Sequence, residues 1–140
     1  MNLATLKVEG DGVGLTKVRK LLALSTSTEW EKGDPKRRGG EYHTSGFVVT
    51  IADSAAPYTM MVRVRHFLRK CKDQGLRFSN FSGVVGLSVG VTVDASTQFA
   101  AYVNLTVDDI AILKELELAV DLTVYSRSDE TVDNGVNSGM

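Results

Sequence analysis

Hydrophobic residues alternate with polar ones along several stretches of the chain, and between those stretches they recur at helical spacing. Residues 3–8 and 46–51 are rich in alternating or β-branched apolar side chains, which predicts two strands. Residues 18–24 carry apolar side chains at helical spacing, with Thr16 before them as the expected N-cap. The polar residues 28–42, which follow this helix, are expected to form a long loop.

The rest of the pattern predicts two more helices and three more strands. From about residue 58 to 74 apolar side chains follow helical spacing, and Gly75 stands where a C-cap belongs. Residues 84–93 alternate between large and small side chains, and 99–105 follow a short turn, which predicts a β-hairpin. Thr106 with Asp109 three residues later predicts a capped helix, and 118–125 alternate as a final strand. The expected core positions of the second helix are Met61, Val64, Phe67, Leu68 and Cys71.

The predicted element order is therefore β-α-β-α-β-β-α-β, a single α+β domain with a sheet backed by helices. Its last six elements spell the β-α-β-β-α-β pattern of the ferredoxin-like, split β-α-β arrangement. We expect this domain to span residues 1–125, since a chain of 140 residues suffices for one core. Residues 126–140 have almost no large apolar side chains, which predicts a disordered C-terminal tail.

Composition narrows the class of protein without identifying it. The chain is 43% hydrophobic and 24% charged, as in ordinary globular domains, and its net charge of −1 excludes a uniformly basic nucleic-acid binder. Cys71 is the single cysteine, which rules out an internal disulfide and fits a reducing compartment. Because the sequence shows no secretory leader and no apolar run long enough for a bilayer, we expect a cytoplasmic protein without membrane contact.

Charge is distributed unevenly along the chain. Residues 1–93 hold fourteen Lys or Arg and eight Asp or Glu, a net +6, whereas residues 94–140 hold two and nine, a net −7. This asymmetry predicts two candidate surfaces for a charged partner. The basic one is also explained as a solvated helix face, and the acidic one as helix-capping acids with an exposed face. The acidic surface comprises Asp108, Asp109, Glu115, Glu117 and Asp121. The alternative, basic surface comprises Arg63, Arg65, Arg69 and Lys70, with Lys36, Arg37 and Arg38 as possible additions.

The stretch TEWEKGDPKRRGGEY, residues 28–42, places the single tryptophan beside the most polar loop. The simplest interpretation is structural: Trp30 folds back over the end of the first helix near Leu24, with its N–H directed to a loop carbonyl. Gly33 permits unusual backbone angles, and Asp34 before a proline opens a turn. The alternative is a tryptophan that binds a ligand.

Three segments carry a resemblance to a known family: LTKVRKLLAL (15–24), WEKGDP (30–35) and DLTVY (121–125). They resemble the bacterial domain of unknown function 4279 over about residues 3–125. The most specific marker is the run from Trp30 to Asp34, whereas the family's tryptophan in the second strand is replaced here by Phe47. The resemblance implies a fold and a bacterial or phage origin, but no activity. Some such domains are similar in size and context to immunity proteins that neutralise toxins.

The sequence offers no recognisable catalytic constellation. Signature motifs of serine hydrolases, zinc proteases and P-loop enzymes are absent. The glycines of GDGVG, residues 10–14, do not have dinucleotide-binding spacing, which favours a plain β-to-α turn. His66 and Cys71 are five apart on one predicted helix, and His43 is remote, so we expect neither a metal site nor a cysteine–histidine pair. No cofactor is expected.

Three functional hypotheses remain open. The first is a non-catalytic protein-binding domain, most concretely an immunity-type inhibitor that neutralises a bacterial toxin or nuclease. A phage-encoded inhibitor of a host defence complex is physically the same proposal. The second is a nucleic-acid-associated protein that uses the basic helix around residues 63–77. The third is a small-ligand binder that uses the loop with Tyr42 and His43.

Overall fold

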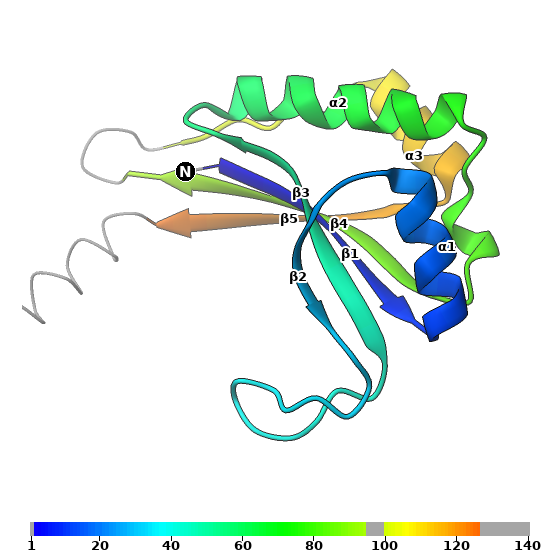
Figure 1. Cartoon of the computed structure of the whole chain (residues 1–140). Coiled ribbons are helices and arrows are strands. Elements are labelled where there is room, and N and C mark those ends of the chain that lie inside the picture. The colour runs from blue at the N-terminus through cyan, green and yellow to red at the C-terminus, as the bar shows by residue number, and fades with distance from the viewer. Residues whose placement is uncertain (1, 95–99, 127–140) are drawn as a thin grey trace, which may run out of the picture.

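The computed structural model describes residues 2–94 and 100–126, which form one mixed five-stranded sheet with helices packed on one face (Figure 1). This arrangement confirms the predicted α+β class. In chain order the elements are β1 (Asn2–Gly10), α1 (Gly12–Leu22), β2 (Thr26–Trp30), β3 (Ser45–Ser54), α2 (Pro57–Asp73), the 3₁₀ turn η1 (Phe78–Asn80), β4 (Gly83–Val93), α3 (Val107–Leu116) and β5 (Ala119–Ser126).

The strands lie in the order β2-β3-β1-β4-β5. Neighbours among the first four strands are antiparallel, whereas β5 runs parallel to β4. The units β1-α1-β2 and β3-α2-β4 are each split by a strand of the other unit, which is the ferredoxin-like arrangement. A further crossover through α3 adds β5 at the edge. The β2–β3 hairpin lies at the opposite edge, and its long loop projects away from α2 (Figure 1).

The predicted element order is wrong at two places, so the ferredoxin-like unit is formed by β1 to β4 and not by the last six predicted elements. The first error is β2, which lies in a stretch whose polar side chains give no strand pattern. The second is the strand expected at 99–105. Residues 100–105 form no strand, and Phe99 lies outside the described residues. Ala101, Val103 and Leu105 are partly buried against the core, whereas the residues between them are exposed, so their alternation reflects packing on one side without strand pairing.

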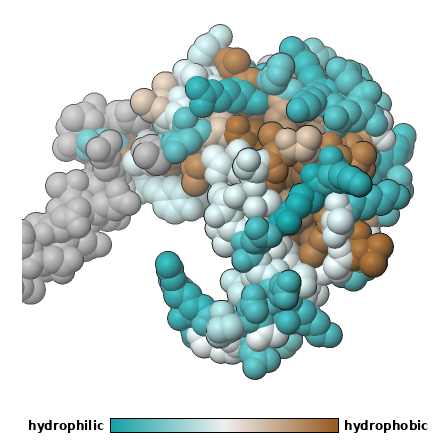
Figure 2. Space-filling model, viewed as in Figure 1, coloured by the Kyte–Doolittle hydropathy of each residue, from teal (hydrophilic) through white to brown (hydrophobic). Residues whose placement is uncertain are grey.

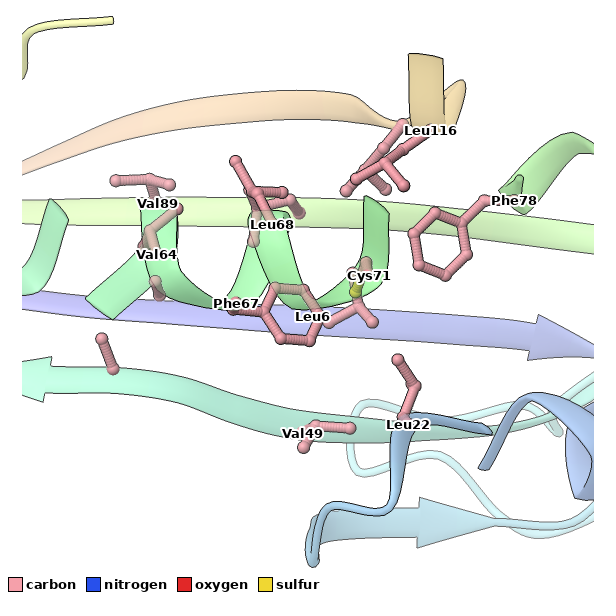
Figure 3. Close-up of a cluster of buried hydrophobic side chains, with 14 of the residues drawn as sticks. Leu6, Leu22, Val49, Val64, Phe67, Leu68, Cys71, Phe78, Val89 and Leu116 are labelled. Atoms are coloured by element: carbon pink, nitrogen blue, oxygen red, sulfur yellow. The ribbon is translucent and has the colours of Figure 1, made fainter. Parts of the chain in front are cut away.

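The core lies between the helices and one face of the sheet. Leu6 on β1 faces Val49 on β3 and Leu87 on β4, which forms a row of buried aliphatic side chains across three strands. The apolar stripe of α2 packs on this row, and all five of its predicted core residues are buried. Figure 3 shows Val64, Phe67, Leu68 and Cys71 of this stripe within the buried cluster. Burial of each large aliphatic side chain is worth about 1.5–3 kcal/mol, so this layer holds α2 against the strands.

Two helices begin with side-chain caps, of which one was predicted. α3 starts with the expected capping box: the Asp109 amide donates to Thr106 Oγ1 at 3.1 Å, and the Thr106 amide donates to Asp109 Oδ2 at 2.9 Å. The prediction of Thr16 as the cap of α1 is wrong. The helix begins at Gly12, so Thr16 lies inside its first turns. Asp11 caps α1 instead: its short carboxylate accepts a hydrogen bond from the Gly14 amide at 2.8 Å.

The end of α2 follows the expected C-terminal pattern. Gly75 adopts a φ of +70°, and the Leu76 amide donates to the Cys71 carbonyl oxygen at 3.1 Å. This left-handed turn satisfies a carbonyl that the helix leaves without a partner. At the C-terminus, Ser126 belongs to β5 rather than to a tail, and the expected disorder of 127–140 concerns residues outside those described. No helix in the described ranges is long and apolar enough to cross a membrane.

Candidate functional site

The basic helix α2 and the acidic helix α3 pack side by side, and their charges pair across the contact. Arg65 Nε donates to both carboxylate oxygens of Asp109, at 3.1 and 2.9 Å, and Arg65 Nη2 donates to the Asn104 carbonyl oxygen at 2.5 Å. Asp109 is only 4% exposed. Asp109 therefore is not part of an acidic surface, which corrects the sequence-based prediction. Arg65, which was predicted for the basic surface, binds Asp109 within the same chain.

The environment of Asp109 favours its ionised form. Burial by itself raises the pKa of a carboxyl group, but the hydrogen bonds from Thr106 and Arg65 outweigh this effect and lower the pKa of Asp109 below its ordinary value. The side chain thus caps α3 and holds α2 at the same time. Its charge stabilises the fold and is not presented to solvent.

Two further cations pair with acids that were predicted to face a partner. Lys72 Nζ lies 3.8 Å from Glu115, and Arg77 Nη1 lies 3.3 Å from Glu117. We refer to Arg65 and Lys72 on α2, together with Arg77 just beyond its C-terminal end, as the α3 flank. Asp108 and Asp121 remain exposed, on the first turn of α3 and on β5. The acidic surface is therefore reduced to separated carboxylates, because its other members neutralise cations of the same chain.

Arg63 and Lys70 lie on the opposite side of α2, along a hollow beside β3. This hollow has a volume of about 390 Å³, and we call it the α2–β3 groove. Figure 2 shows hydrophobic residues exposed among and below the hydrophilic side chains that cover α2 on this side of the molecule. The lining residues are Leu24, Thr50, Ile51, Val62, Arg63, His66, Phe67 and Lys70.

The cations of the groove differ from those of the α3 flank in their partners. Arg63, His66 and Lys70, which we call the groove flank, form no ion pair with any residue of the described ranges. Arg63 Nη1 donates to the Asp53 carbonyl oxygen at 3.2 Å, which holds the guanidinium beside β3. Arg69, also predicted for the basic surface, is exposed on the outer side of α2. The groove flank can therefore accept a carboxylate from outside.

The cations of the β2–β3 loop do not join this surface, contrary to the prediction. Lys36, Arg37 and Arg38 lie in the loop that projects away from α2 (Figure 1). The loop is shaped by backbone hydrogen bonds, such as Lys36 N to Gly40 O at 2.9 Å, and by the Asp34 carboxylate, which accepts from the Glu31 amide at 2.8 Å. The basic residues predicted as one surface thus occupy four separate places: the contact with α3, the groove, the outer side of α2 and the projecting loop.

Trp30 lies in β2 and not over the end of α1, so the predicted lid is wrong. In the sheet it pairs with Gly46 of β3, and a Cβ added to Gly46 would come within 2.3 Å of the indole ring. Gly46 in turn pairs with Glu9, whose side chain belongs to the face of β1 opposite the core. The ring therefore covers the glycine on the helix-free face. Its Nε1–H donates to the Thr44 carbonyl oxygen at 3.0 Å, as expected.

An aromatic stack fixes the base of the projecting loop. The rings of Trp30 and Tyr42 lie 4.9 Å apart at an angle of 21°. Lys7 lies 5.7 Å from the Trp30 ring, and Lys36 lies 5.5 Å from the Tyr42 ring, so a cation flanks the stack at each end. Gly33 adopts the predicted left-handed backbone, with a φ of +94°. These contacts account for Trp30 and Tyr42 as structural residues.

The groups with nucleophilic or metal-binding chemistry lie apart. Cys71 is buried in the core, and burial raises the pKa of its thiol to about 11, so the thiol is neutral near pH 7. His66 lies on the exposed rim of the groove. Among residues 2–94 and 100–126, no three histidine, cysteine, aspartate or glutamate side chains are placed to hold a metal ion together. The GDGVG turn is closed by the Asp11 cap and by Phe81, which packs against Gly14.

No protein-family model, no curated protein and no solved structure matches this chain. The likeness to domain family 4279 therefore stays a prediction. The apolar half of the groove was also missed from the sequence, because it forms only when Leu24, which is distant in the chain, and Ile51 of the preceding strand pack beside α2. The available signal was the cationic helix itself, with Phe67 beside its apolar stripe.

Proposed function

We propose that the chain is a non-catalytic protein-binding domain, most concretely an immunity-type inhibitor that neutralises a bacterial toxin or nuclease by stoichiometric binding. The supporting observation is the α2–β3 groove, which combines an apolar floor with a rim of cations that form no ion pair within residues 2–94 and 100–126. Apolar surface gives a protein interface most of its affinity, and charge at its edge gives orientation and a faster encounter. The proposed partner therefore presents an acidic surface with an apolar centre.

This proposal moves the binding surface from the acidic residues to the groove. An acid that already pairs with a lysine or arginine of its own chain gains little from a second cation, whereas an unpaired cation gains a new ion pair. Glu115 and Glu117 are of the first kind. Arg63 and Lys70 are of the second kind within the described part of the chain.

Co-expression tests this function. The protein encoded by a toxin-like reading frame next to this gene is the first candidate partner, and we expect the chain to restore growth and to form a 1:1 complex with it. The double variant Arg63→Glu, Lys70→Glu should lose both effects, whereas Lys36→Glu, Arg38→Glu in the projecting loop changes the same charge and should retain them. Protection that survives the groove variant but is lost with the loop variant would exclude the groove as the binding surface.

A nucleic-acid-associated function is the second candidate, supported by the exposed cations along α2: Arg63, Arg69 and Lys70. Phosphate binding makes affinity fall steeply with salt, roughly in proportion to the number of phosphates neutralised. Fluorescence anisotropy with labelled single-stranded and duplex oligonucleotides at low salt separates this candidate from protein binding. A small anionic ligand is the third possibility, since a volume of about 390 Å³ suits such a molecule.

A further inference from the structure

The edge of β3 beside the groove has no partner strand in the described part of the chain. β2 pairs with β3 only from Gly46 to Val49, whereas β3 continues to Ser54. On their other side, Thr50 and residues 52–54 pair with β1, and Ile51 is the extra residue of a β-bulge in that pairing. About five residues, or roughly 17 Å of strand, are therefore open to an additional strand at this edge. Thr50 and Ile51, at the start of this open stretch, also line the groove.

The side chains above this edge favour a particular kind of strand. The floor of the groove is apolar, from Leu24, Ile51 and Phe67, and the groove flank of α2 supplies the cations. Arg63 already contacts the backbone of the open stretch through the Asp53 carbonyl oxygen. The Asp53 side chain does not compete for the guanidinium, because Asp53 pairs with Leu3, which belongs to the helix-free face.

We propose that the partner binds this groove with an extended segment that adds to the open edge of β3. This segment carries an apolar residue with one carboxylate before it and one after it. This inference rests on the proposed protein-binding function and specifies how the partner is recognised. Backbone hydrogen bonds to an exposed edge supply affinity in such strand addition, and pockets for alternate side chains supply specificity.

The spacing of the cations fits this pattern. Arg63 and Lys70 are seven residues apart on α2, which corresponds to about 10.5 Å along the helix. Carboxylates four residues apart on one side of a strand are separated by about 13 Å, and the residue midway between them faces the same side. Because arginine, lysine and glutamate side chains are long and adjustable, two carboxylates with a central valine can reach the two cations and the apolar floor together.

The other open edge of the sheet, at β5, does not offer this combination. Leu122 and Val124 are exposed there, but the charged residue of β5 within the described structure is Asp121. An acidic segment would meet a like charge at that edge. The inference therefore selects one edge of the sheet over the other.

A set of short synthetic peptides tests the inference. The probe is acetyl-Glu-Thr-Val-Thr-Glu-amide, and its affinity is measured from amide NMR shifts of the intact protein. Matched controls replace both glutamates with lysine, replace the valine with serine, or N-methylate either the valine or the two threonines. We expect the lysine and serine peptides to bind at least about tenfold more weakly. Only alternate residues of an added strand donate backbone hydrogen bonds to the neighbouring strand. One of the two N-methylated peptides should therefore lose as much affinity, and the other should bind like the probe.

Variants of the protein locate the site. Arg63→Glu, Lys70→Glu should weaken binding of the probe at least about tenfold, and Lys36→Glu, Arg38→Glu should leave it unchanged. Both pairs lie on exposed side chains, and a urea titration of each variant verifies that the fold is intact. Equal binding of both N-methylated peptides, tighter binding of the lysine peptide, or no binding of the probe would overturn the inference. The inference would also be overturned if decanoate or an oligonucleotide displaced the probe at a concentration lower than that of the probe itself.

Failure of the inference is distinguishable from failure of the proposed function. If the chain protects cells and forms a 1:1 complex while the probe does not bind, strand addition is wrong and the inhibitor proposal stands. If neither occurs, both are wrong.

Discussion

The two flanks of α2 carry similar cations and differ in what lies opposite them. On the α3 flank, Arg65 meets the buried carboxylate of Asp109 and the Asn104 carbonyl oxygen, and its side chain is only 22% exposed. On the groove flank, Arg63 and Lys70 meet apolar side chains and a strand edge, with no carboxylate from the described residues. One helix therefore provides cations of two kinds, which the sequence does not distinguish.

The difference teaches that a cation stabilises a fold or serves a partner according to which anions its own chain supplies. A buried arginine whose carboxylate is removed leaves a costly unpaired charge, whereas an exposed arginine without a partner costs the fold almost nothing. The two flanks should thus respond in opposite ways to substitution. Stability should depend on the α3 flank, and binding should depend on the groove flank.

The largest expected effect is the loss of Arg65. Replacement Arg65→Ala leaves Asp109 buried without its cation and removes the donor to Asn104, so the free energy of unfolding should fall by about 2–3 kcal/mol. Urea denaturation followed by circular dichroism measures this change. The matched control Arg63→Ala should cost less than about 0.5 kcal/mol. Equal losses for both variants would contradict the assignment of the two flanks.

The pH dependence of stability gives the next largest effect. Because the folded-state pKa of Asp109 is lowered, its ionised form stabilises the fold above the unfolded pKa of about 3.9, and this contribution is lost as the pH falls through the folded pKa. At pH 7, Asp109→Asn should lower the free energy of unfolding by about 1–2 kcal/mol. The difference from wild type should shrink below about pH 4. A difference that persists unchanged to pH 2 would refute this account.

A smaller effect is expected from the exposed pair on the same flank. Lys72 and Glu115 are both about half exposed and 3.8 Å apart, so their coupling should be less than about 0.5 kcal/mol. A double-mutant cycle with Lys72→Ala and Glu115→Ala measures this coupling. A value near that of the buried pair would mean that the exposed members of the α3 flank also hold the two helices together.

The smallest effect on stability is expected on the groove flank. The double variant Arg63→Ala, Lys70→Ala removes two exposed side chains and one hydrogen bond to a backbone carbonyl. The free energy of unfolding, measured by urea denaturation, should therefore change by less than about 0.5 kcal/mol. A loss of more than about 1.5 kcal/mol would show that these cations hold the fold together. They would then not be free for a partner.

The helices and most strands were predictable because their apolar positions repeat with a clear period. β4 alternates from Val85 to Val93, and α2 shows an apolar stripe that the structure buries. β2 could not be predicted, because an edge strand of Thr-Ser-Thr-Glu-Trp owes its conformation to pairing with β3 rather than to its own pattern. Local propensity yields to tertiary contacts at such places.

The candidate site was predictable only in its parts. The sequence identified the charged residues, but Arg65 and Asp109 are 44 positions apart, and only the packing of two helices brings them together. The same packing decides that Arg63 is left without a carboxylate. Trp30 illustrates the same limit: its hydrogen bond to a loop carbonyl was expected from the chemistry of indole, whereas its place over Gly46 follows from strand register.

The most direct test of the central claim is amide hydrogen exchange of the intact protein with and without the peptide acetyl-Glu-Thr-Val-Thr-Glu-amide. We predict increased protection confined to residues 50–54 of β3, with amide shifts on the groove flank of α2 and unchanged exchange on α3. Protection along β5 or in the β2–β3 loop, or exchange that does not respond to the peptide, would contradict the claim that the unpaired flank of α2 and the open edge of β3 form the binding site.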